Sequence, residues 1–169
     1  LMGGKPAGSD EDGYGGGILG KGGPLNMTDC AVTGNTAEAG GGIYAKKDGT
    51  VASVTISGGT IGGAGADANK TLSSNSGGGI YIGEYCSLTM KDNVKITGNE
   101  TGVSGGDIYA DTDSTLLMKD CTVSGNKASG SSGGLHARGN LTMTGCTVSD
   151  NKTTGDSGGG VYLAGTAKI

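Results

Sequence analysis

The chain has 169 residues, of which 39 are Gly, and it contains no Trp and no Phe. The glycines do not recur at every third position, which excludes a collagen triple helix, and the low aromatic content argues against an ordinary globular core. Charged residues make up only 17% of the chain and the net charge is −4, which argues against a highly charged disordered tail and against a nucleic-acid-binding protein with a basic patch.

Two classes of targeting segment are also not expected from the sequence. No apolar run approaches the roughly 18 residues of a transmembrane helix. The first residues lack the apolar stretch of a signal peptide, and we expect an irregular segment over 1–12.

From residue 13 onward the chain is built from an internal repeat. Two glycines (Gly-Asp in one copy) precede an aliphatic residue in each copy, and these aliphatic residues are Ile18, Ile43, Ile80, Ile108, Leu135 and Val161. They are separated by 25, 37, 28, 27 and 26 residues. Each copy also carries a Leu-x-Met-like segment and a Val-x-Gly-Asn-like segment. Apolar and polar residues alternate in all three segments, which predicts short strands separated by turns.

A single copy of this unit cannot bury its apolar face, whereas stacked copies can, because like residues then lie about 4.8 Å apart. We therefore expect an all-β fold, a right-handed parallel β-helix (β-solenoid) with three short strands per coil and about 5–6 coils of 25–28 residues. The solenoid is expected to form a single domain over 1–169, with a loop excursion over 62–76 and partial coils at both ends.

Stacking converts each repeat position into a ladder. Met27, Met90, Met118 and Met143 occupy one inward position, with Ile56 replacing Met in one coil. Asn35, Asn99, Asn126 and Asn151 occupy another position, where Asn side chains can hydrogen-bond to backbone and to one another. Both ladders are expected to be structural.

Two of the four cysteines are expected on adjacent coils. Cys121 and Cys146 share an inward position, and a Cα separation near 4.8 Å is compatible with a disulfide. Free thiols packed as small hydrophobes are the alternative. Cys86 lies in a segment that we expect to be exposed or half-buried.

Aromatic residues follow the aliphatic position in most copies and are expected to point outward. They form one column, whose members are Tyr44, Tyr81, Tyr109, His136 and Tyr162; Tyr14 and Tyr85 are expected outside it. Exposed aromatic faces can stack on sugar rings or anchor a protein partner. The alternative is that the rings only stabilise the sheet through cross-strand contacts.

The two recurring motifs resemble the polymorphic outer-membrane-protein repeats of chlamydiae and related Gly/Ser/Thr/Asn-rich repeats in surface proteins of gut anaerobes. The resemblance covers about 13–169. Those repeats carry Gly-Gly-Ala-Ile and Phe-x-x-Asn. Here the Phe is replaced by Val32, Ile96, Val123 and Val148, which favours the gut-type relatives. The resemblance implies a right-handed β-helix, an extracellular location on the bacterial cell surface, and adhesion.

A catalytic role is the less favoured interpretation. Polysaccharide-active β-helices need clustered carboxylates, and the acidic clusters here, Asp10–Asp12 and Asp111 with Asp113, are expected in loops. We expect no catalytic residue, no metal site and no cofactor.

The sequence therefore predicts a structural or adhesion module that presents the aromatic column to a glycan or a host or cell-surface protein. The alternatives are a filament subunit that self-associates end to end and, less favoured, a polysaccharide-active enzyme.

Overall fold

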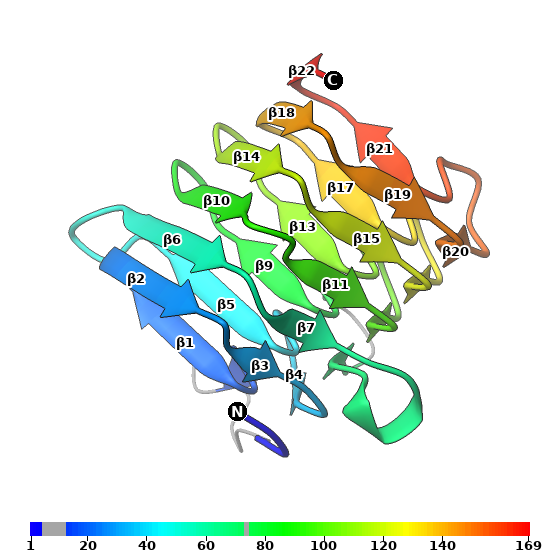
Figure 1. Cartoon of the computed structure of the whole chain (residues 1–169), viewed down its shortest axis with the longest axis horizontal. Helices are drawn as coiled ribbons and strands as arrows, with labels where there is room; N and C mark the ends of the chain where they lie inside the picture. Colours follow the sequence, from blue (N-terminus) through cyan, green and yellow to red (C-terminus); the bar gives the residue numbers. More distant parts are fainter. Residues whose placement is uncertain (5–12, 73–74) are drawn as a thin grey trace.

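The computed structural model describes residues 1–4, 13–72 and 75–169. Four short strands recur in each of five coils, a sixth, partial coil adds two strands, and matching strands of neighbouring coils pair in parallel (Figure 1). The result is a parallel β-solenoid of about five turns, which confirms the predicted fold class. Within the described residues, no helix is long and apolar enough to span a bilayer.

The predicted Gly-Gly-aliphatic and Leu-x-Met segments form two six-stranded sheets. The first sheet contains β1 (Ile18–Lys21), β5 (Ile43–Lys46), β9 (Ile80–Ile82), β13 (Ile108–Ala110), β17 (Leu135–Ala137) and β21 (Val161–Leu163). The second sheet contains β2 (Gly23–Thr28), β6 (Ala52–Ser57), β10 (Ser87–Lys91), β14 (Thr115–Lys119), β18 (Asn140–Thr144) and β22 (Thr166–Lys168).

The remaining strands form two five-stranded sheets. The third sheet contains β3 (Ala31–Val32), β7 (Thr60–Gly62), β11 (Lys95–Thr97), β15 (Thr122–Ser124) and β19 (Thr147–Ser149). The fourth sheet contains β4 (Thr36–Ala37), β8 (Lys70–Thr71), β12 (Glu100–Thr101), β16 (Lys127–Ala128) and β20 (Lys152–Thr153). The expectation of three strands per coil thus omitted a fourth, because a two-residue strand is too short to show a period of two.

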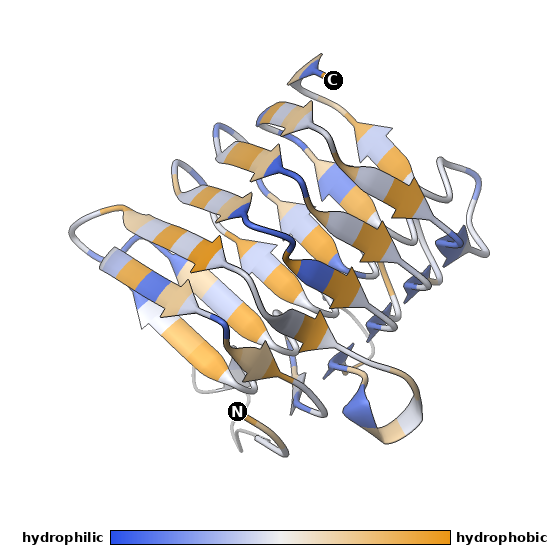
Figure 2. Ribbon diagram, viewed as in Figure 1, coloured by the Kyte–Doolittle hydropathy of each residue, from blue (hydrophilic) through white to orange (hydrophobic). Residues whose placement is uncertain are grey.

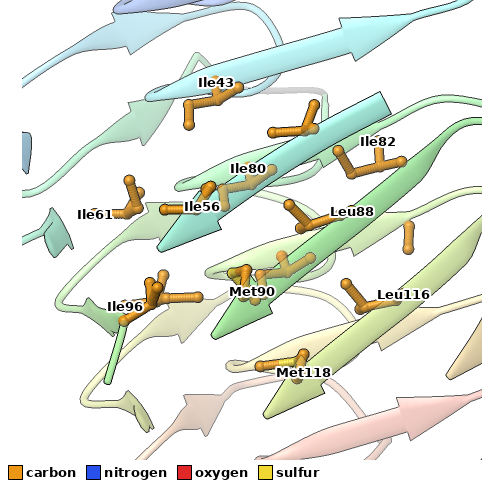
Figure 3. Close-up of a cluster of buried hydrophobic side chains, with 14 of the residues drawn as sticks. Ile43, Ile56, Ile61, Ile80, Ile82, Leu88, Met90, Ile96, Leu116 and Met118 are labelled. Atoms are coloured by element: carbon orange, nitrogen blue, oxygen red, sulfur yellow. The ribbon is translucent and has the colours of Figure 1, made fainter. Parts of the chain in front are cut away.

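Apolar and polar residues alternate along the strands (Figure 2), so each strand directs one side toward the narrow interior. In the first sheet Ile43 pairs with Ile80 and Ile80 with Ile108, and all three are fully buried. The methionine ladder runs through the second sheet, where Met90 pairs with Met118. Figure 3 shows Ile43, Ile80, Met90 and Met118 among the side chains that meet between the sheets. Burial of each is worth roughly 1.5–3 kcal/mol, so the ladders supply the core that the sequence predicted.

Glycines before the first sheet permit close contact between coils. Gly40 has φ +58°, a value that disfavours most side chains. At Gly42 an added Cβ would lie 2.7 Å from the carbonyl oxygen of Gly79 in the next coil. The next coil therefore leaves little room for a side chain at this corner, where five of the six copies carry glycine and the sixth carries Asp107.

The predicted excursion over 62–76 is shorter in the structure. It contains a 3-10 turn over Gly65–Asp67, after which Asn69 returns to the coil and β8 joins the fourth sheet. The separation from Ile61 to Asn69 is eight residues, against three from Val32 to Asn35. The insertion therefore adds five residues before the ladder position and leaves the coil intact.

The two ends of the chain pair with neighbouring coils. Met2 forms a parallel bridge with Thr33, so residues 1–4 of the predicted irregular segment contact the solenoid, while 5–12 lie outside the described residues. At the other end, β22 pairs with β18.

Candidate functional site

A column of rings runs along the outer side of the first sheet. Parallel pairing places Tyr44 opposite Tyr81, Tyr81 opposite Tyr109, and His136 between Tyr109 and Tyr162. The structure therefore brings together all five residues that the sequence placed in one column. In-register parallel strands produce this arrangement directly, because the same repeat position recurs in every coil.

The rings of this column stack on one another. Ring centroids are 4.7 Å apart for Tyr44 and Tyr81, 5.1 Å for Tyr81 and Tyr109, 5.0 Å for Tyr109 and His136, and 4.6 Å for His136 and Tyr162. Interplanar angles range from 12° to 29°. Each inner ring therefore has both faces covered. The expectation that these faces are open to a sugar is wrong for the inner rings, which present only their edges.

Tyr14 belongs to the column, contrary to the sequence-based expectation. Its ring stacks on that of Tyr44 at a centroid distance of 4.7 Å. Tyr14 precedes its Gly-Gly motif instead of following it, so the repeat pattern could not reveal its position.

His136 is the most buried ring of the column, with only 8% of its surface exposed. Burial, assisted by the Arg138 guanidinium, lowers the pKa of this imidazole. Its Nδ1 atom has no hydrogen-bond partner among the described residues. The ring is therefore neutral near pH 7 and acts as an aromatic member of the stack.

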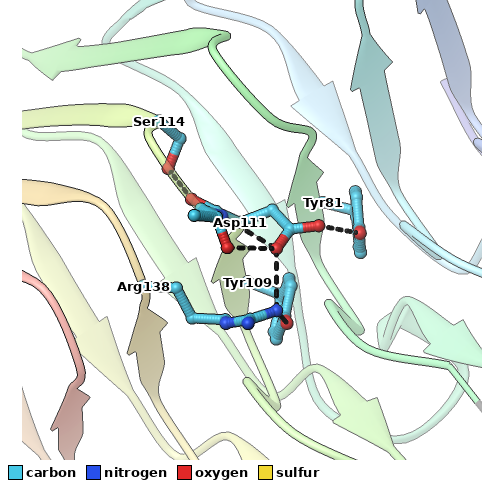
Figure 4. Close-up of polar contacts among 6 residues, drawn as sticks. Tyr81, Tyr109, Asp111, Ser114 and Arg138 are labelled. Atoms are coloured by element: carbon cyan, nitrogen blue, oxygen red, sulfur yellow. Dashed lines mark hydrogen bonds and ion pairs between the residues drawn. The ribbon is translucent and has the colours of Figure 1, made fainter.

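A polar cluster fixes the edge of the column (Figure 4). The hydroxyl of Tyr81 donates to Asp111 Oδ2 at 2.9 Å, and Arg138 Nη1 donates to Asp111 Oδ1 at 3.0 Å and to the Tyr109 hydroxyl oxygen at 3.3 Å. Burial raises the pKa of Tyr81, and the Asp111 carboxylate raises it further. Asp111 therefore links the Tyr81 hydroxyl to the Arg138 guanidinium, which in turn donates to the Tyr109 hydroxyl oxygen.

Sequence reasoning missed the role of this cluster. It treated Asp111 as a loop residue and gave Arg138 no role. Asp111 and Arg138 each come two residues after a ring of the column, Tyr109 and His136 respectively. That shared offset was the available signal, since it places both side chains at the same strand ends on consecutive coils.

A cavity of about 310 Å³ opens beside the column, and its lining residues include Tyr44, Tyr81, Asp111, Lys47, Glu84 and Tyr85. Tyr85 is 57% exposed, and the Lys47 Nζ atom lies 5.8 Å from its ring centroid. The Tyr85 backbone has φ +61°, a left-handed conformation that is typical of turns. Tyr85, which the sequence placed outside the column, is thus the most exposed aromatic residue at this site.

Inside the solenoid, the asparagines form a continuous hydrogen-bonded ladder. Each Nδ2 atom donates to the Oδ1 atom of the next coil's asparagine, and each such Oδ1 also accepts the preceding asparagine's backbone N–H. The members are Asn35, Asn69, Asn99, Asn126 and Asn151. Asn69 was not anticipated, because the five-residue insertion removes it from the Gly-Asn motif.

One carboxyl group enters this ladder. Asp107 replaces the second glycine of its motif, is fully buried, and accepts hydrogen bonds from the Nδ2 atoms of Asn99 at 2.9 Å and Asn126 at 3.2 Å. The Asn99–Asn126 side-chain bond is the longest of the ladder, at 3.4 Å. Burial raises the pKa of Asp107 well above its ordinary value, although the Asn99 amide acts in the opposite direction.

The cysteines are all free thiols in the structure. Cys121 Sγ donates to the Lys119 carbonyl at 3.1 Å, and burial raises the pKa of this thiol to about 11. Cys146 Sγ donates to the Thr144 carbonyl instead of bonding to Cys121. Cys86 is 1% exposed, which contradicts the expectation of an exposed or half-buried position. It packs in the core behind the turn at Tyr85.

The acidic residues form no obvious metal site in the part of the chain that the structure covers, where no three His, Cys, Asp or Glu side chains converge. Asp29, Asp92 and Asp120 all have positive φ, which is a turn conformation. The acidic cluster Asp10–Asp12 lies outside the described residues.

The comparisons with known proteins agree with this geometry. The family model described as "Right handed beta helix region" matches residues 16–169. A search of curated proteins and a search of solved structures each returned no match. The family match covers nearly the whole solenoid, and its description gives the right-handedness that the sequence predicted. The chain belongs to the right-handed β-helix family.

Proposed function

We propose that this chain is a non-enzymatic extracellular module, a rigid β-helical segment of a bacterial surface protein that binds a glycan beside its ring column. The observation that carries the proposal is the cavity that the exposed Tyr85 lines together with Tyr44, Tyr81 and Asp111. The resemblance of the repeats to those of bacterial surface proteins supports the location.

The chemistry of the cavity suits a saccharide. An exposed tyrosine ring offers an apolar face with a polar tip, and Lys47, Glu84 and Asp111 place charged donors and acceptors around it. Its volume of about 310 Å³ falls at the small end of the usual range of ligand pockets, about 300–1,000 Å³. In this proposal the stacked column serves as a stiff wall, and Tyr85 supplies the stacking face.

Right-handed β-helices include both enzymes and non-enzymes. The hydrogen bonding of Asp111 favours a non-enzymatic role for this chain. Its Oδ2 accepts from Tyr81, while its Oδ1 accepts from Arg138 and from the backbone N–H of Thr112. A general base needs a carboxylate oxygen free to take a proton from a substrate or water. Asp111 is instead held as a structural anchor of the column.

The test is binding of the purified chain to an array of immobilised neutral and acidic oligosaccharides. We expect Tyr85→Ala to lower the affinity for a bound glycan at least tenfold, as removal of an aromatic anchor does, while Tyr85→Phe keeps the ring and the affinity. Undiminished binding by Tyr85→Ala would overturn the assignment of the site. Release of reducing ends or unsaturated products from the bound glycan would overturn the non-enzymatic role.

A further inference from the structure

A second surface lies on the fourth sheet, away from the ring column. Two adjoining cavities of about 510 and 240 Å³ share Glu100, Thr101 and Ser129, and together they extend from β8 to β20. They form one groove that crosses four consecutive coils. We name this feature the lysine groove, after Lys70, Lys127 and Lys152, which line it.

The lysine groove carries an excess of positive charge. Parallel pairing places Lys70, Glu100, Lys127 and Lys152 in one column, in that order. Three lysines against one glutamate give a local net charge of +2 on a chain whose net charge is −4. The groove is therefore a local exception to the charge of the molecule.

The single carboxylate is shared by two of the lysines. Glu100 Oε2 lies 2.9 Å from Lys70 Nζ, and Glu100 Oε1 lies 3.7 Å from Lys127 Nζ. Among the described residues, Lys152 forms no ion pair. Lys152 stands directly opposite Lys127, and like charges in this position repel each other.

Hydroxyl groups and backbone complete the groove. Ser129 and Thr154 line it next to the lysines, and the Thr154 hydroxyl donates to the Ser129 carbonyl. Lys127 keeps 64% of its side chain exposed, so its ammonium group is accessible. An anionic group between Lys127 and Lys152 would offset the repulsion between the two ammonium groups and would accept hydrogen bonds from both.

We propose that the lysine groove binds a linear sulfated polysaccharide, with one sulfate ester between Lys127 and Lys152. Lys127 and Lys152 lie on adjacent coils, about 4.8 Å apart along the axis of the solenoid, and Lys70 lies on the other side of Glu100, two coils from Lys127. A chain with repeated anionic groups can therefore follow the groove from one coil to the next. A sulfate ester offers three acceptor oxygens and, as the ester of a strong acid, stays ionised throughout the neutral and mildly acidic pH range.

The experiment is a titration of the whole chain with dextran sulfate by calorimetry at low and high salt, with uncharged dextran and carboxymethyl dextran as comparison polymers. We expect dextran sulfate to bind at low salt, to weaken as salt screens the charges, and to bind more tightly than the carboxylated polymer. Uncharged dextran should not compete.

The variants separate the groove from the general charge of the protein. We expect Lys127→Gln with Lys152→Gln to weaken binding at least tenfold, and Lys95→Gln with Lys119→Gln, which removes the same charge from the second and third sheets, to weaken it less than threefold. Glu100→Gln removes the internal competitor for the lysines and should strengthen binding severalfold.

Three results would overturn the proposal: no binding of dextran sulfate by the unaltered chain, an equal loss in both double variants, or equal affinity for the carboxylated polymer. All the altered side chains are at least partly exposed, and retention of the β-sheet circular dichroism signal verifies that each variant is folded. The Tyr85→Ala variant should bind dextran sulfate normally, which distinguishes the lysine groove from the glycan site proposed above.

Discussion

The ring column and the lysine groove are built by the same rule and have opposite consequences. In both, parallel register places a repeat position directly above itself in the next coil. Rings placed in this way attract one another and cover their own faces, whereas ammonium groups repel one another and remain accessible. A ladder whose neighbouring side chains attract one another is therefore structural. A ladder whose neighbouring side chains repel one another is a place where a ligand can bind.

In the asparagine ladder the neighbouring side chains hydrogen-bond to one another from coil to coil, and breaking this ladder should have the largest effect on stability. Asn99→Ala removes acceptor and donor groups that contact Asn69, Asp107 and the Ile61 carbonyl. Each polar group left unpaired in the interior costs about 1–3 kcal/mol, so we expect the free energy of unfolding to fall by about 3 kcal/mol or more in urea denaturation.

The exposed asparagine Asn26 provides the matched control. Asn26→Ala, which makes the same chemical change on the outer side of the second sheet, should alter the free energy of unfolding by less than about 0.5 kcal/mol. Equal effects of the two substitutions would show that the interior ladder does not stabilise the coil.

Asp107 places a fully buried carboxyl group beside the asparagine ladder, and it should make stability depend on pH. In the folded protein the buried carboxyl keeps its proton above the unfolded value of 3.8. The folded state then binds more protons than the unfolded state, so stability falls as pH rises from about 4 toward the raised folded pKa. Each unit of raised pKa corresponds to about 1.4 kcal/mol.

We expect Asp107→Asn to remove this loss and to be more stable than the unaltered chain at pH 7, as measured by urea denaturation from pH 4 to 8. His136 acts with the opposite sign, because its pKa is lowered and its contribution is lost as pH falls below 6.5. Because His136 is present in both proteins, its contribution cancels when the free energy of unfolding of the variant is compared with that of the unaltered chain at each pH. Asp113→Asn, at an exposed turn, is the control, and an unchanged pH profile for Asp107→Asn would refute this view of the interior.

The ring column should give a smaller effect. Tyr109→Ala removes two stacked contacts and the hydrogen bond from Arg138. Aromatic pairs contribute about 0.5–1.5 kcal/mol each, so we expect a loss of about 1–3 kcal/mol in urea denaturation. Tyr85→Ala, in which the ring is exposed and outside the stack, should cost less than about 0.5 kcal/mol. A similar loss for both would mean that the stack adds nothing to ordinary burial.

The parts of the molecule that could be predicted from the sequence are those in which a recognisable motif recurs in each coil. The register of the first three sheets could be predicted from the repeat positions of Ile43, Ile80 and their equivalents. The spacing of these residues and the alternation of apolar and polar residues around them are visible in the sequence itself. Asn69 was missed because an insertion displaced it, and the fourth sheet because its strands have two residues. The stacking of the rings depends on side-chain torsions and on the polar cluster at Asp111, neither of which a period can reveal.

The central claim, that register makes rings attract and lysines repel, is tested most directly by two double-mutant cycles measured in urea. For Tyr44 and Tyr81, replaced singly and together by Ala, we predict a favourable coupling free energy of about 0.5–1.5 kcal/mol. For Lys127 and Lys152, replaced by Gln, we predict an unfavourable coupling of about 0.2–1 kcal/mol that disappears near 1 M NaCl, where screening acts within about 3 Å. A favourable or salt-independent coupling between the lysines, or none between the tyrosines, would contradict the account.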